Sequence, residues 1–316
     1  MARIPVESLR IGQDLHGQTF LLRSKQLATA RNGSPYLRVN LADRTGIVPG
    51  IQFDVNPTVA DSLAEGQGVI VWGRVDEYRG QLQVNIDRMG PAQLDALQEF
   101  LPLARRPMAE MLDEFEALLA SIEHPDLSAL LTAIFDDDVE LRAAFEQAPA
   151  AKTYHHACVG GLLEHTLSVV RIIESAGSVY PELDRDLVVT AALLHDLGKI
   201  WSYDPLSFQM TPRGSLLSHV YMSAAYVEQR IREIDGFSPD VALRLLHALL
   251  AHHGRLEYGS PTVPQTLEAM VLHSADKLDG DARGALDAYA RSDGTGAFSE
   301  YSTMHETRLY QGEGDS

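Results

Sequence analysis

The segment from Leu187 to Ile200, LVVTAALLHDLGKI, constrains the fold more than any other part of the chain. The eight residues from Leu187 to Leu194 are apolar or small enough for the interior of a helix bundle, and His195 and Asp196 then stand side by side before Gly198, a typical helix stop. A buried imidazole next to a buried carboxylate costs free energy unless both groups are paired. A divalent metal ion would pair them, because neutral histidine and ionised aspartate are both metal ligands. The two residues alone fit equally well a capped helix end with a hydrogen-bonded core histidine.

Further candidate ligands lie on other predicted helices, among apolar neighbours. Together with the first pair, the set in chain order is His165, His195, Asp196, His219, His252, His253 and Asp276. If these residues were buried independently, each would need a partner of its own, whereas one shared metal cluster satisfies all of them. The residues therefore favour metal ligation over a collection of separate core histidines.

Length and composition indicate the number of domains and the class of protein. A chain of 316 residues is long for a single core, so two domains are expected. It is 45% apolar and 22% charged, as in soluble globular proteins, and no apolar run approaches the roughly 20 residues that span a bilayer. The N-terminus lacks the apolar region of a secretory signal. The single cysteine, Cys158, excludes an internal disulfide, is interpreted as a small buried thiol, and favours a cytoplasmic protein without a membrane partner.

The net charge of −18 is unevenly distributed along the chain. Residues 1–90 hold 10 basic and 9 acidic side chains, which leaves 16 basic and 35 acidic ones for the rest. Binding of a polyanion depends on the local electrostatic potential rather than on the total charge, so the N-terminal part can still bind one. The acidic remainder is compatible with cation sites, and equally with an ordinary solvated surface.

Two regions of different kind follow one another along the chain. Short strands separated by turn signals are predicted at 16–27, 36–41, 47–53, 69–75 and 81–86. Five strands within residues 1–90 suit an all-β OB-like barrel, with its helix expected in the 54–67 connection. A linker over 91–107 leads to an all-α bundle over 108–316, whose core is expected at about 155–281. Its helices are predicted at 108–122, 126–135, 137–147, 159–175, 186–197, 215–234, 239–253 and 264–280. The tail from 290 is polar and mixed, and its last few residues are expected to be loose.

The second predicted strand presents a row of polar and aromatic side chains on its outer face. Tyr36, Arg38 and Asn40 alternate with apolar residues, and Trp72 with Arg74 repeats the pairing of an aromatic ring with a cation on the fourth strand. Such a row can stack a base, hold a phosphate and hydrogen-bond a base edge. On an OB-like barrel the row favours binding of a single strand, although each residue alone fits a solvated face.

The order His165, His195-Asp196, Asp276 resembles the HD-domain superfamily, a helical fold of metal-dependent phosphohydrolases, and the additional histidines resemble its dinuclear members. The barrel followed by GGLLEHT (160–166), ALLHDLGKI (192–200), LLHALLAHHG (245–254), EYGSP (257–261) and LHSADKLDG (272–280) resembles the YhaM-type 3′→5′ exoribonucleases over nearly the whole chain. Ser218 departs from the pattern, because a glycine is expected before the third histidine, which puts the helix packing there in question.

The resemblance implies a dinuclear metal centre. One ion would be held by His165, His195, Asp196 and Asp276, and the other by His219 with His252 or His253, with Asp196 bridging. His252 is preferred over His253, which would bind as well or orient a phosphate. Histidine and aspartate ligands without a thiolate suit Mn²⁺, Fe²⁺ or Co²⁺ better than a structural Zn²⁺, with Mn²⁺ preferred. Two ions about 3.5–4 Å apart would activate a bridging water and stabilise the attacking and leaving oxygens at phosphorus.

Cationic side chains near these motifs are candidates for contacts with the substrate. Lys199, three residues after Asp196, could neutralise a phosphate oxygen or could be a surface lysine beyond a helix end. Arg255 and Lys277 are further substrate-binding candidates. His273, on the face of Asp276, is expected to support the ligands rather than bind the metal.

Other ionisable residues near the motifs are interpreted as structural. His155 and His156 are interpreted as loop residues near a helix start, with a contact to the site as the alternative. Glu164 is expected to face away from the site, and His124 and His247 to be ordinary surface or core residues.

The function that the resemblance implies is hydrolysis of single-stranded RNA, with single-stranded DNA as a second candidate, from the 3′ end to nucleoside 5′-monophosphates. Three alternatives stay open: a phosphohydrolase of free or cyclic nucleotides with a regulatory barrel, a dinuclear iron oxygenase, and a non-catalytic nucleic-acid-binding factor. The last leaves the potential ligands without a role. The sequence also leaves a homo-oligomer open.

Overall fold

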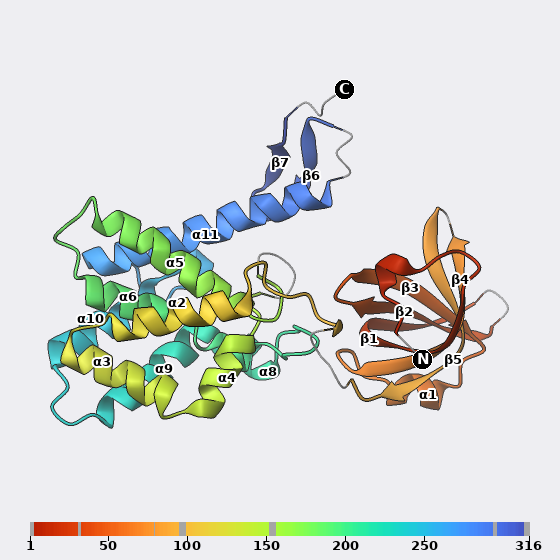
Figure 1. Ribbon diagram of the computed structural model, residues 1–316, viewed down its shortest axis with the longest axis horizontal. Helices are drawn as coiled ribbons and strands as arrows, with labels where there is room; N and C mark the ends of the chain where they lie inside the picture. The colour runs from red at the N-terminus through yellow and green to blue at the C-terminus, as the bar shows by residue number, and fades with distance from the viewer. Residues whose placement is uncertain are drawn as a thin grey trace. The chain divides into compact units, whose positions relative to one another are not determined.

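The computed structural model describes residues 3–30, 33–78, 80–94, 99–151, 156–292 and 296–312. The chain forms two compact units, one made of Met1–Leu103 with Leu206–Phe208 and the other of Ala104–Pro205 with Gln209–Ser316. The first unit is a β-barrel and the second is a bundle of helices (Figure 1). This order confirms the predicted fold class.

The barrel consists of five strands, β1 (Asp14–Thr29), β2 (Pro35–Asp43), β3 (Gly46–Phe53), β4 (Gly68–Tyr78) and β5 (Gln81–Ala92). It closes in the order β1-β2-β3-β5-β4, in which β3 and β5 are parallel and the other neighbours antiparallel. A short 3₁₀ turn, η1 (Val6–Ser8), precedes β1, and α1 (Pro57–Ser62) connects β3 to β4, where the OB-like pattern places its helix. In β2 the apolar residues Leu37 and Val39 are buried while Arg38 and Asn40 are exposed, which is the alternation that the sequence predicts.

Strand β1 pairs with both β2 and β4, so it belongs to two seams of the barrel. Its register shifts between His16 and Gln18 and again between Leu22 and Ser24, and such bulges bend a strand enough to close a barrel. Gly17 has φ +77°, and a Cβ there would lie 3.3 Å from the ring of Trp72. Glycine at this position therefore permits both the bulge and the close approach of the indole.

The second unit is built from helices of unequal length. They are α2 (Met108–Ala120), α3 (Pro125–Leu131), a π-helical turn η3 (Thr132–Asp136), α4 (Val139–Gln147), α5 (Gly161–Gly177), α6 (Arg185–Leu194), α7 (Lys199–Ser202), α8 (Pro212–Leu217), α9 (His219–Arg232), α10 (Pro239–Ala251), η4 (Leu256–Tyr258) and α11 (Leu267–Arg291). The side chains of Asp138, Asp184, Thr211 and Thr266 accept hydrogen bonds from the first-turn amides of α4, α6, α8 and α11. These N-caps explain where four of the helices begin.

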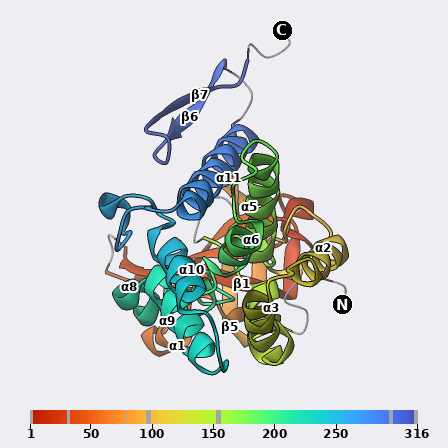
Figure 2. The same cartoon turned by 90° about the vertical axis from the view of Figure 1, so that its left-hand side faces the viewer.

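Helix α6 lies at the centre of this unit and packs against α5, α10 and α11 (Figure 2). Every residue from Leu187 to Leu194 is buried, as expected for a helix that is apolar or small on all sides. The chain therefore delivers His195 and Asp196 into the interior of the bundle rather than to its surface. Among the described residues, no helix is both long and apolar enough to cross a bilayer.

The helix predicted at 215–234 is in fact two helices, because the chain turns at Ser218. Ser218 has φ +63° and ψ 142°, a conformation that L-residues with a side chain rarely adopt. The glycine expected at this position would take up such a conformation without strain.

The chain beyond α11 forms an antiparallel hairpin of β6 (Phe298–Ser302) and β7 (Thr307–Tyr310) at the end of that helix (Figures 1 and 2). The prediction of a merely polar tail missed it. The last residues, 313–316, which were expected to be loose, lie outside the described part of the chain. The final long helix also runs eleven residues beyond the predicted end at 280.

Candidate metal centre and nucleic-acid interface

The end of α6 places two ionisable side chains inside the bundle. His195 and Asp196 are 0% and 2% exposed. The helix ends at Leu194, before the predicted stop at Gly198, and Gly198 has φ −61°, so it is not a left-handed cap. A Cβ on Gly198 would lie 2.3 Å from the carbonyl oxygen of His219, so the glycine is required by close packing of the following turn against α9.

One half of the site contains two histidines and two aspartates from α5, the end of α6 and α11. His165 Nε2 lies 3.3 Å from Asp196 Oδ2 and 3.2 Å from Asp276 Oδ1. His195 Nε2 lies 3.3 Å and 3.8 Å from the same two oxygens. The structure thus brings together the four residues assigned to the first ion.

The other half faces the second oxygen of the same aspartate. Asp196 Oδ1 lies 3.2 Å from His219 Nε2 and 3.8 Å from His252 Nε2. The ring of His253 lies 4.4 Å from that of His252 and 5.1 Å from that of His219, measured between centroids, and ligand atoms of the three histidines lie within 4.8 Å of one another. Asp196 therefore presents one oxygen to each half of the site, as expected for a bridging ligand.

Six polar atoms of this cluster are buried without a well-aligned hydrogen bond among the described residues, and only one of them, Asp196 Oδ2, has a lysine ammonium group beside it, that of Lys199 at 2.6 Å. They are both carboxylate oxygens of Asp196 and the Nε2 atoms of His165, His195, His219 and His252. An unpaired buried polar atom costs free energy, and six that converge on one volume indicate a missing common partner. A divalent cation fits this donor set, because all six atoms can supply a lone pair.

Electrostatics distinguish the two halves. Burial disfavours a charged imidazole at His165 and His195, but the surrounding carboxylates outweigh it, raising the pKa of His165 well above its usual range and that of His195 to about 9. At His219 and His252 burial dominates, lowering the pKa of His219 to about 3 and that of His252 well below its usual range. The pKa of Asp196 stays well below its usual range despite its burial, because of the adjacent His195 and other cationic neighbours. The carboxylates of the first half therefore favour positive charge, either as protons on the rings or as a bound cation that displaces those protons, and the second half presents neutral imidazoles.

Hydrogen bonds at Nδ1, the ring nitrogen away from the cluster, hold several of these histidines in place. His195 Nδ1 faces the carbonyl oxygen of Ala192 at 2.7 Å, and His252 Nδ1 faces that of Leu249 at 2.7 Å. Because a carbonyl oxygen only accepts, Nδ1 carries a hydrogen, which leaves Nε2 as the ring atom that can offer a lone pair to a bound cation. His253 is held in the same way by the carbonyl oxygen of Tyr258 at 2.8 Å.

The cations near the cluster differ in their exposure. Lys199 is not a surface lysine: its side chain is 14% exposed, and Nζ lies 2.6 Å from Asp196 Oδ2. Lys277 is half-exposed and pairs with Asp281 at 2.5 Å. A pocket of about 250 Å³ opens beside the cluster and is lined by His253, Tyr258, His273, Asp276 and Lys277. Arg255 lies over the ring of Tyr258 at 6.0 Å, so the pocket combines metal-site residues with cations and an exposed aromatic ring.

Two residues that the sequence interpretation overlooked or read as a loop residue, Asp279 and His156, lie on the side of His165 away from the metal cluster. Asp279 Oδ2 is 2.7 Å from His165 Nδ1 and 3.1 Å from Nε2 of His156, which is buried. The interpretation of His156 as only a loop residue is therefore wrong, whereas His155 lies outside the described residues. Glu164 turns away from the cluster as expected, yet it reaches His156 Nδ1 at 2.9 Å. His273 supports the site as expected, with Nδ1 2.7 Å from the carbonyl oxygen of His252.

The barrel carries the predicted outer row on β2. Arg38 lies over the ring of Tyr36 at 5.4 Å, and Asn40 donates a hydrogen bond to Ser24 Oγ at 3.0 Å. The ring of Tyr36 lies 6.0 Å from that of Phe53, its register partner on β3, which is 61% exposed. The sequence interpretation did not include Phe53, although it shares the outward-facing parity of β3 with Ile51.

The other two predicted barrel residues lie on β4. The strand register connects Arg38 through Ile51 and Asn85 to Arg74, so Arg74 continues the row around the barrel. Trp72 stacks with Arg88 of β5, whose guanidinium carbon is 3.9 Å from the ring centroid. Exposed aromatic rings and cations therefore occur on four adjacent strands, which is the composition of a single-strand-binding surface.

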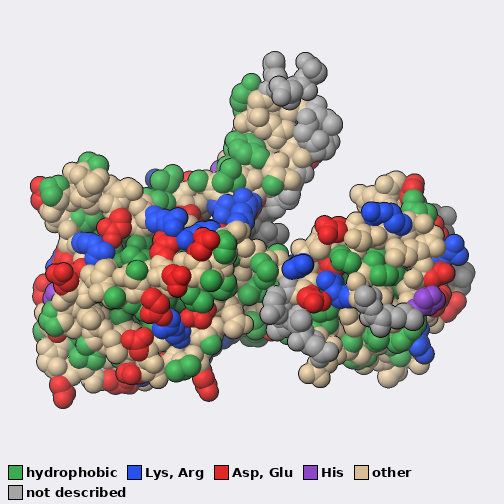
Figure 3. Space-filling view, in the orientation of Figure 1, with side chains coloured by type: hydrophobic (Ala, Val, Ile, Leu, Met, Phe, Trp, Pro, Cys, Tyr) green, Lys and Arg blue, Asp and Glu red, His purple; other side chains and the backbone are tan. Residues whose placement is uncertain are grey.

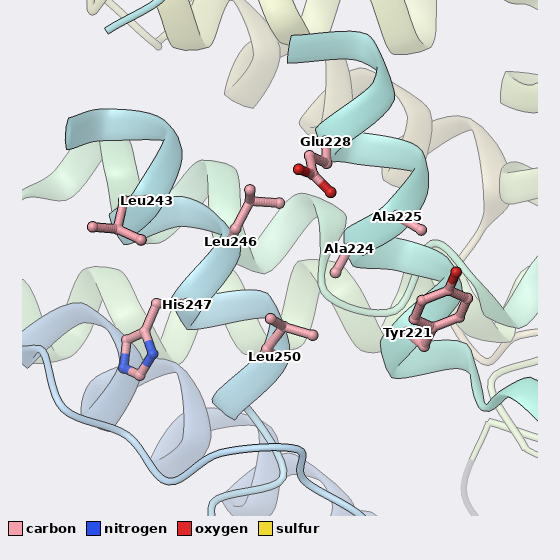
Figure 4. A pocket seen from close by; sticks show the side chains of 8 residues that line it. All are labelled: Tyr221, Ala224, Ala225, Glu228, Leu243, Leu246, His247 and Leu250. Atoms are coloured by element: carbon pink, nitrogen blue, oxygen red, sulfur yellow. The ribbon is translucent and has the colours of Figure 1, made fainter. Parts of the chain in front are cut away.

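A second hollow lies between α9 and α10, away from the metal residues. It has a volume of about 460 Å³ and is lined by Tyr221, Ala224, Ala225, Glu228, Leu243, Leu246, His247 and Leu250 (Figure 4). These residues include none of the predicted ligands, and the groove is mainly apolar. His247 accepts a hydrogen bond from the amide of Gln265 there, in keeping with its structural interpretation. Acidic side chains are scattered among basic ones over the visible face of the helical unit, with no single-sign surface (Figure 3).

Both units match known families. Residues 162–281 match the HD domain, and residues 21–92 match the OB-fold nucleic acid binding domain. Fold and site together define an HD-domain protein with an attached OB-fold nucleic-acid-binding domain. The 3′-5′ exoribonuclease YhaM of Bacillus velezensis is 32% identical over 266 residues, 83% of each chain, and that of Listeria monocytogenes is 32% identical over 287 residues, 89% of each chain. The chain belongs to this family of YhaM proteins.

The solved structures include a similar barrel. The second OB-fold domain of replication protein A from Methanococcus maripaludis is 17% identical and covers 30% of this chain and 99% of its own, with a TM-score of 0.24.

Proposed function

We propose that the protein is a metal-dependent exonuclease that digests single-stranded RNA from its 3′ end and releases nucleoside 5′-monophosphates. The observation that carries the proposal is the convergence of four unpartnered, buried imidazole nitrogens on the two carboxylate oxygens of Asp196. The substrate class and the direction of digestion come from the relatives, which are named 3′-5′ exoribonucleases.

Two divalent ions would be held by the two halves of the cluster. The first half is His165, His195, Asp196 and Asp276, and the second is His219 and His252, with Asp196 shared and His253 at the edge. Mn²⁺ is the first choice, with Fe²⁺ and Co²⁺ next, since the donors are imidazoles and carboxylates. Bound there, the ions would supply an acidified water and positive charge beside the reacting phosphate.

The protein's own side chains position the phosphate. Lys199 is fixed by Asp196 in the interior, so its ammonium group adds a preorganised positive charge next to the site. Arg255 and Lys277 stand at the pocket beside the cluster, where they can contact the phosphates of an entering strand. Water adds to phosphorus, the bond from phosphorus to the 3′ oxygen breaks, and that oxygen leaves with a proton. The phosphate therefore stays on the 5′ oxygen of the released nucleotide.

The barrel would hold the strand that is being digested. Tyr36 and Phe53 provide stacking surfaces, Arg38 and Arg74 provide positive charge, and Trp72 stacks with Arg88. Stacking of this kind is tolerant of sequence, so single-stranded DNA is a second ligand and substrate candidate. We place the activity in the cytoplasm, in keeping with the single cysteine.

The test uses 5′-labelled single-stranded RNA with added Mn²⁺. The wild-type protein is expected to give a ladder shortened from the 3′ end together with mononucleotides, and Asp196→Asn is expected to abolish both. Asp113→Asn, an exposed aspartate on α2, serves as the matched control and is expected to retain activity. Equal activity of wild type and Asp196→Asn would refute the mechanism. Turnover of free or cyclic nucleotides that is indifferent to Tyr36→Ala and Trp72→Ala would instead indicate a small-nucleotide phosphohydrolase.

A further inference from the structure

His165 is anchored differently from three other histidines of the metal cluster. His195, His252 and His253 each direct Nδ1 to a backbone carbonyl oxygen at 2.7–2.8 Å. His165 instead directs Nδ1 to a carboxylate oxygen, Asp279 Oδ2, at 2.7 Å. A carboxylate accepts this hydrogen bond more strongly than a carbonyl does and makes the opposite nitrogen a better metal ligand.

Asp279 is itself held by a buried chain of ionisable groups. His156 Nε2 lies 3.1 Å from Asp279 Oδ2, and His156 Nδ1 lies 2.9 Å from Glu164 Oε2. The side chains of His156 and Glu164 are 1% and 2% exposed, and that of Asp279 is 13% exposed. Both contacts of His156 are satisfied together when both ring nitrogens carry hydrogen, because ionised carboxylates only accept. Burying three ionisable groups in a row is costly, and the proposed reaction does not use them directly.

The group formed by His165, His156 and Asp279 does not have the properties of a third metal site. Its donor atoms lie close enough together to hold an ion. However, His165 Nδ1, His156 Nε2 and Asp279 Oδ2 are already satisfied by hydrogen bonds to one another, unlike the unpartnered atoms on the other side of His165. A satisfied group of atoms needs no ion, so a role in supporting His165 accounts better for the geometry.

We propose that Asp279, held by His156 and Glu164, is a positioning residue that fixes His165 with hydrogen on Nδ1 and the lone pair of Nε2 toward the first metal ion. The inference rests on the proposed metal centre and deepens it: the carboxylate strengthens the half formed by His165, His195 and Asp276 and leaves the half formed by His219 and His252 unaffected. Loss of a supporting group of this kind lowers metal affinity by about 10–100-fold.

The experiment is a titration of the metal-free full-length protein with Co²⁺, followed by visible absorption and calorimetry. In the wild type, two binding steps are expected. In Asp279→Asn one step is expected to weaken by about 10–100-fold while the other stays within about 2-fold. Asp279→Glu, which keeps a carboxylate, is expected to recover part of the loss, and His156→Gln is expected to weaken the same step by less. Asp113→Asn, on the exposed face of α2, is the charge-matched control and should bind Co²⁺ as the wild type does.

The outcomes separate the positioning role from the metal centre. Two unchanged steps in both Asp279→Asn and His156→Gln would overturn the positioning role while leaving the metal centre intact. Equal weakening of both steps, together with a lower melting temperature of the metal-free protein, would show a general structural role and overturn it as well. A wild-type protein that binds no Co²⁺ would overturn both this inference and the proposed function.

Discussion

Replacing Ser218 by glycine should stabilise the helical unit. Ser218 joins α8 to α9 with φ +63° and ψ 142°, and its side chain makes no capping hydrogen bond to α9. A side chain in such a sparsely populated backbone region costs about 1–3 kcal/mol. Glycine removes this strain but gains about 0.4–1 kcal/mol of conformational freedom in the unfolded chain. The net gain should be about 1 kcal/mol, which raises the melting temperature of a unit of this size by about 2–4 °C.

The assay is thermal unfolding followed by far-ultraviolet circular dichroism, which reports mainly on the helices. Ser215→Gly is the matched control, because Ser215 is an exposed residue inside α8 without a positive φ. The same chemical change should destabilise the protein there by about 0.5–1 kcal/mol. Ser218→Ala keeps the strain and loses only the hydroxyl group, so it should not raise the melting temperature. If Ser218→Gly lowers the melting temperature as Ser215→Gly does, the argument from backbone strain is refuted.

Three further predictions concern packing, binding and reactivity. Gly198→Ala should destabilise the protein by about 1–3 kcal/mol, because its Cβ would meet the carbonyl oxygen of His219. Gly177→Ala, with open space around it at the end of α5, should be neutral or slightly stabilising in the same melting experiment. Tyr36→Ala should weaken binding of single-stranded RNA by about 1–3 kcal/mol in fluorescence anisotropy, while hydrolysis of a dinucleotide is unchanged; equal loss of both would contradict a separate binding surface. Burial raises the pKa of Cys158 to about 12, so a thiol reagent at pH 8 (about four units below that pKa) should modify it only after unfolding; rapid labelling of the native protein would disprove its burial.

Local patterns in the sequence were sufficient to predict most of the fold. The alternation of Leu37, Arg38 and Val39 predicts a half-buried strand, and the continuous apolar run before His195 predicts a central helix. The convergence of the predicted histidines and aspartates could be expected because each is a polar residue in an apolar context, which requires a partner wherever it is buried; their role as metal ligands stays a prediction. The strand and helix predictions depend on neighbours in sequence, and the structure confirms them.

Other features depend on contacts between distant residues. Asp279 and His165 are 114 positions apart, and although Asp279 lies one helical turn after Asp276 within the motif LHSADKLDG, no local pattern indicates that it contacts His165. The need for glycine at position 198 comes from the carbonyl oxygen of His219, on a different helix. The hairpin after α11 was missed because its strands have four and five residues and little apolar alternation. At Ser218 the order is reversed: the family resemblance predicted a glycine at this position, and the positive φ of Ser218 gives the physical reason for that glycine.

The carboxylate of Glu164 also determines where the helical domain can be separated from the rest of the chain. Its Oε1 accepts hydrogen bonds from the backbone amides of Arg105 and Arg106 at 3.1 and 3.0 Å, and the amide of Ala104 donates to the carbonyl oxygen of Val159 at 2.9 Å. A truncated protein that starts at the first residue of α2, Met108, would leave this buried acid without two of its donors. An excised domain that retains its native interior must therefore begin at or before Ala104.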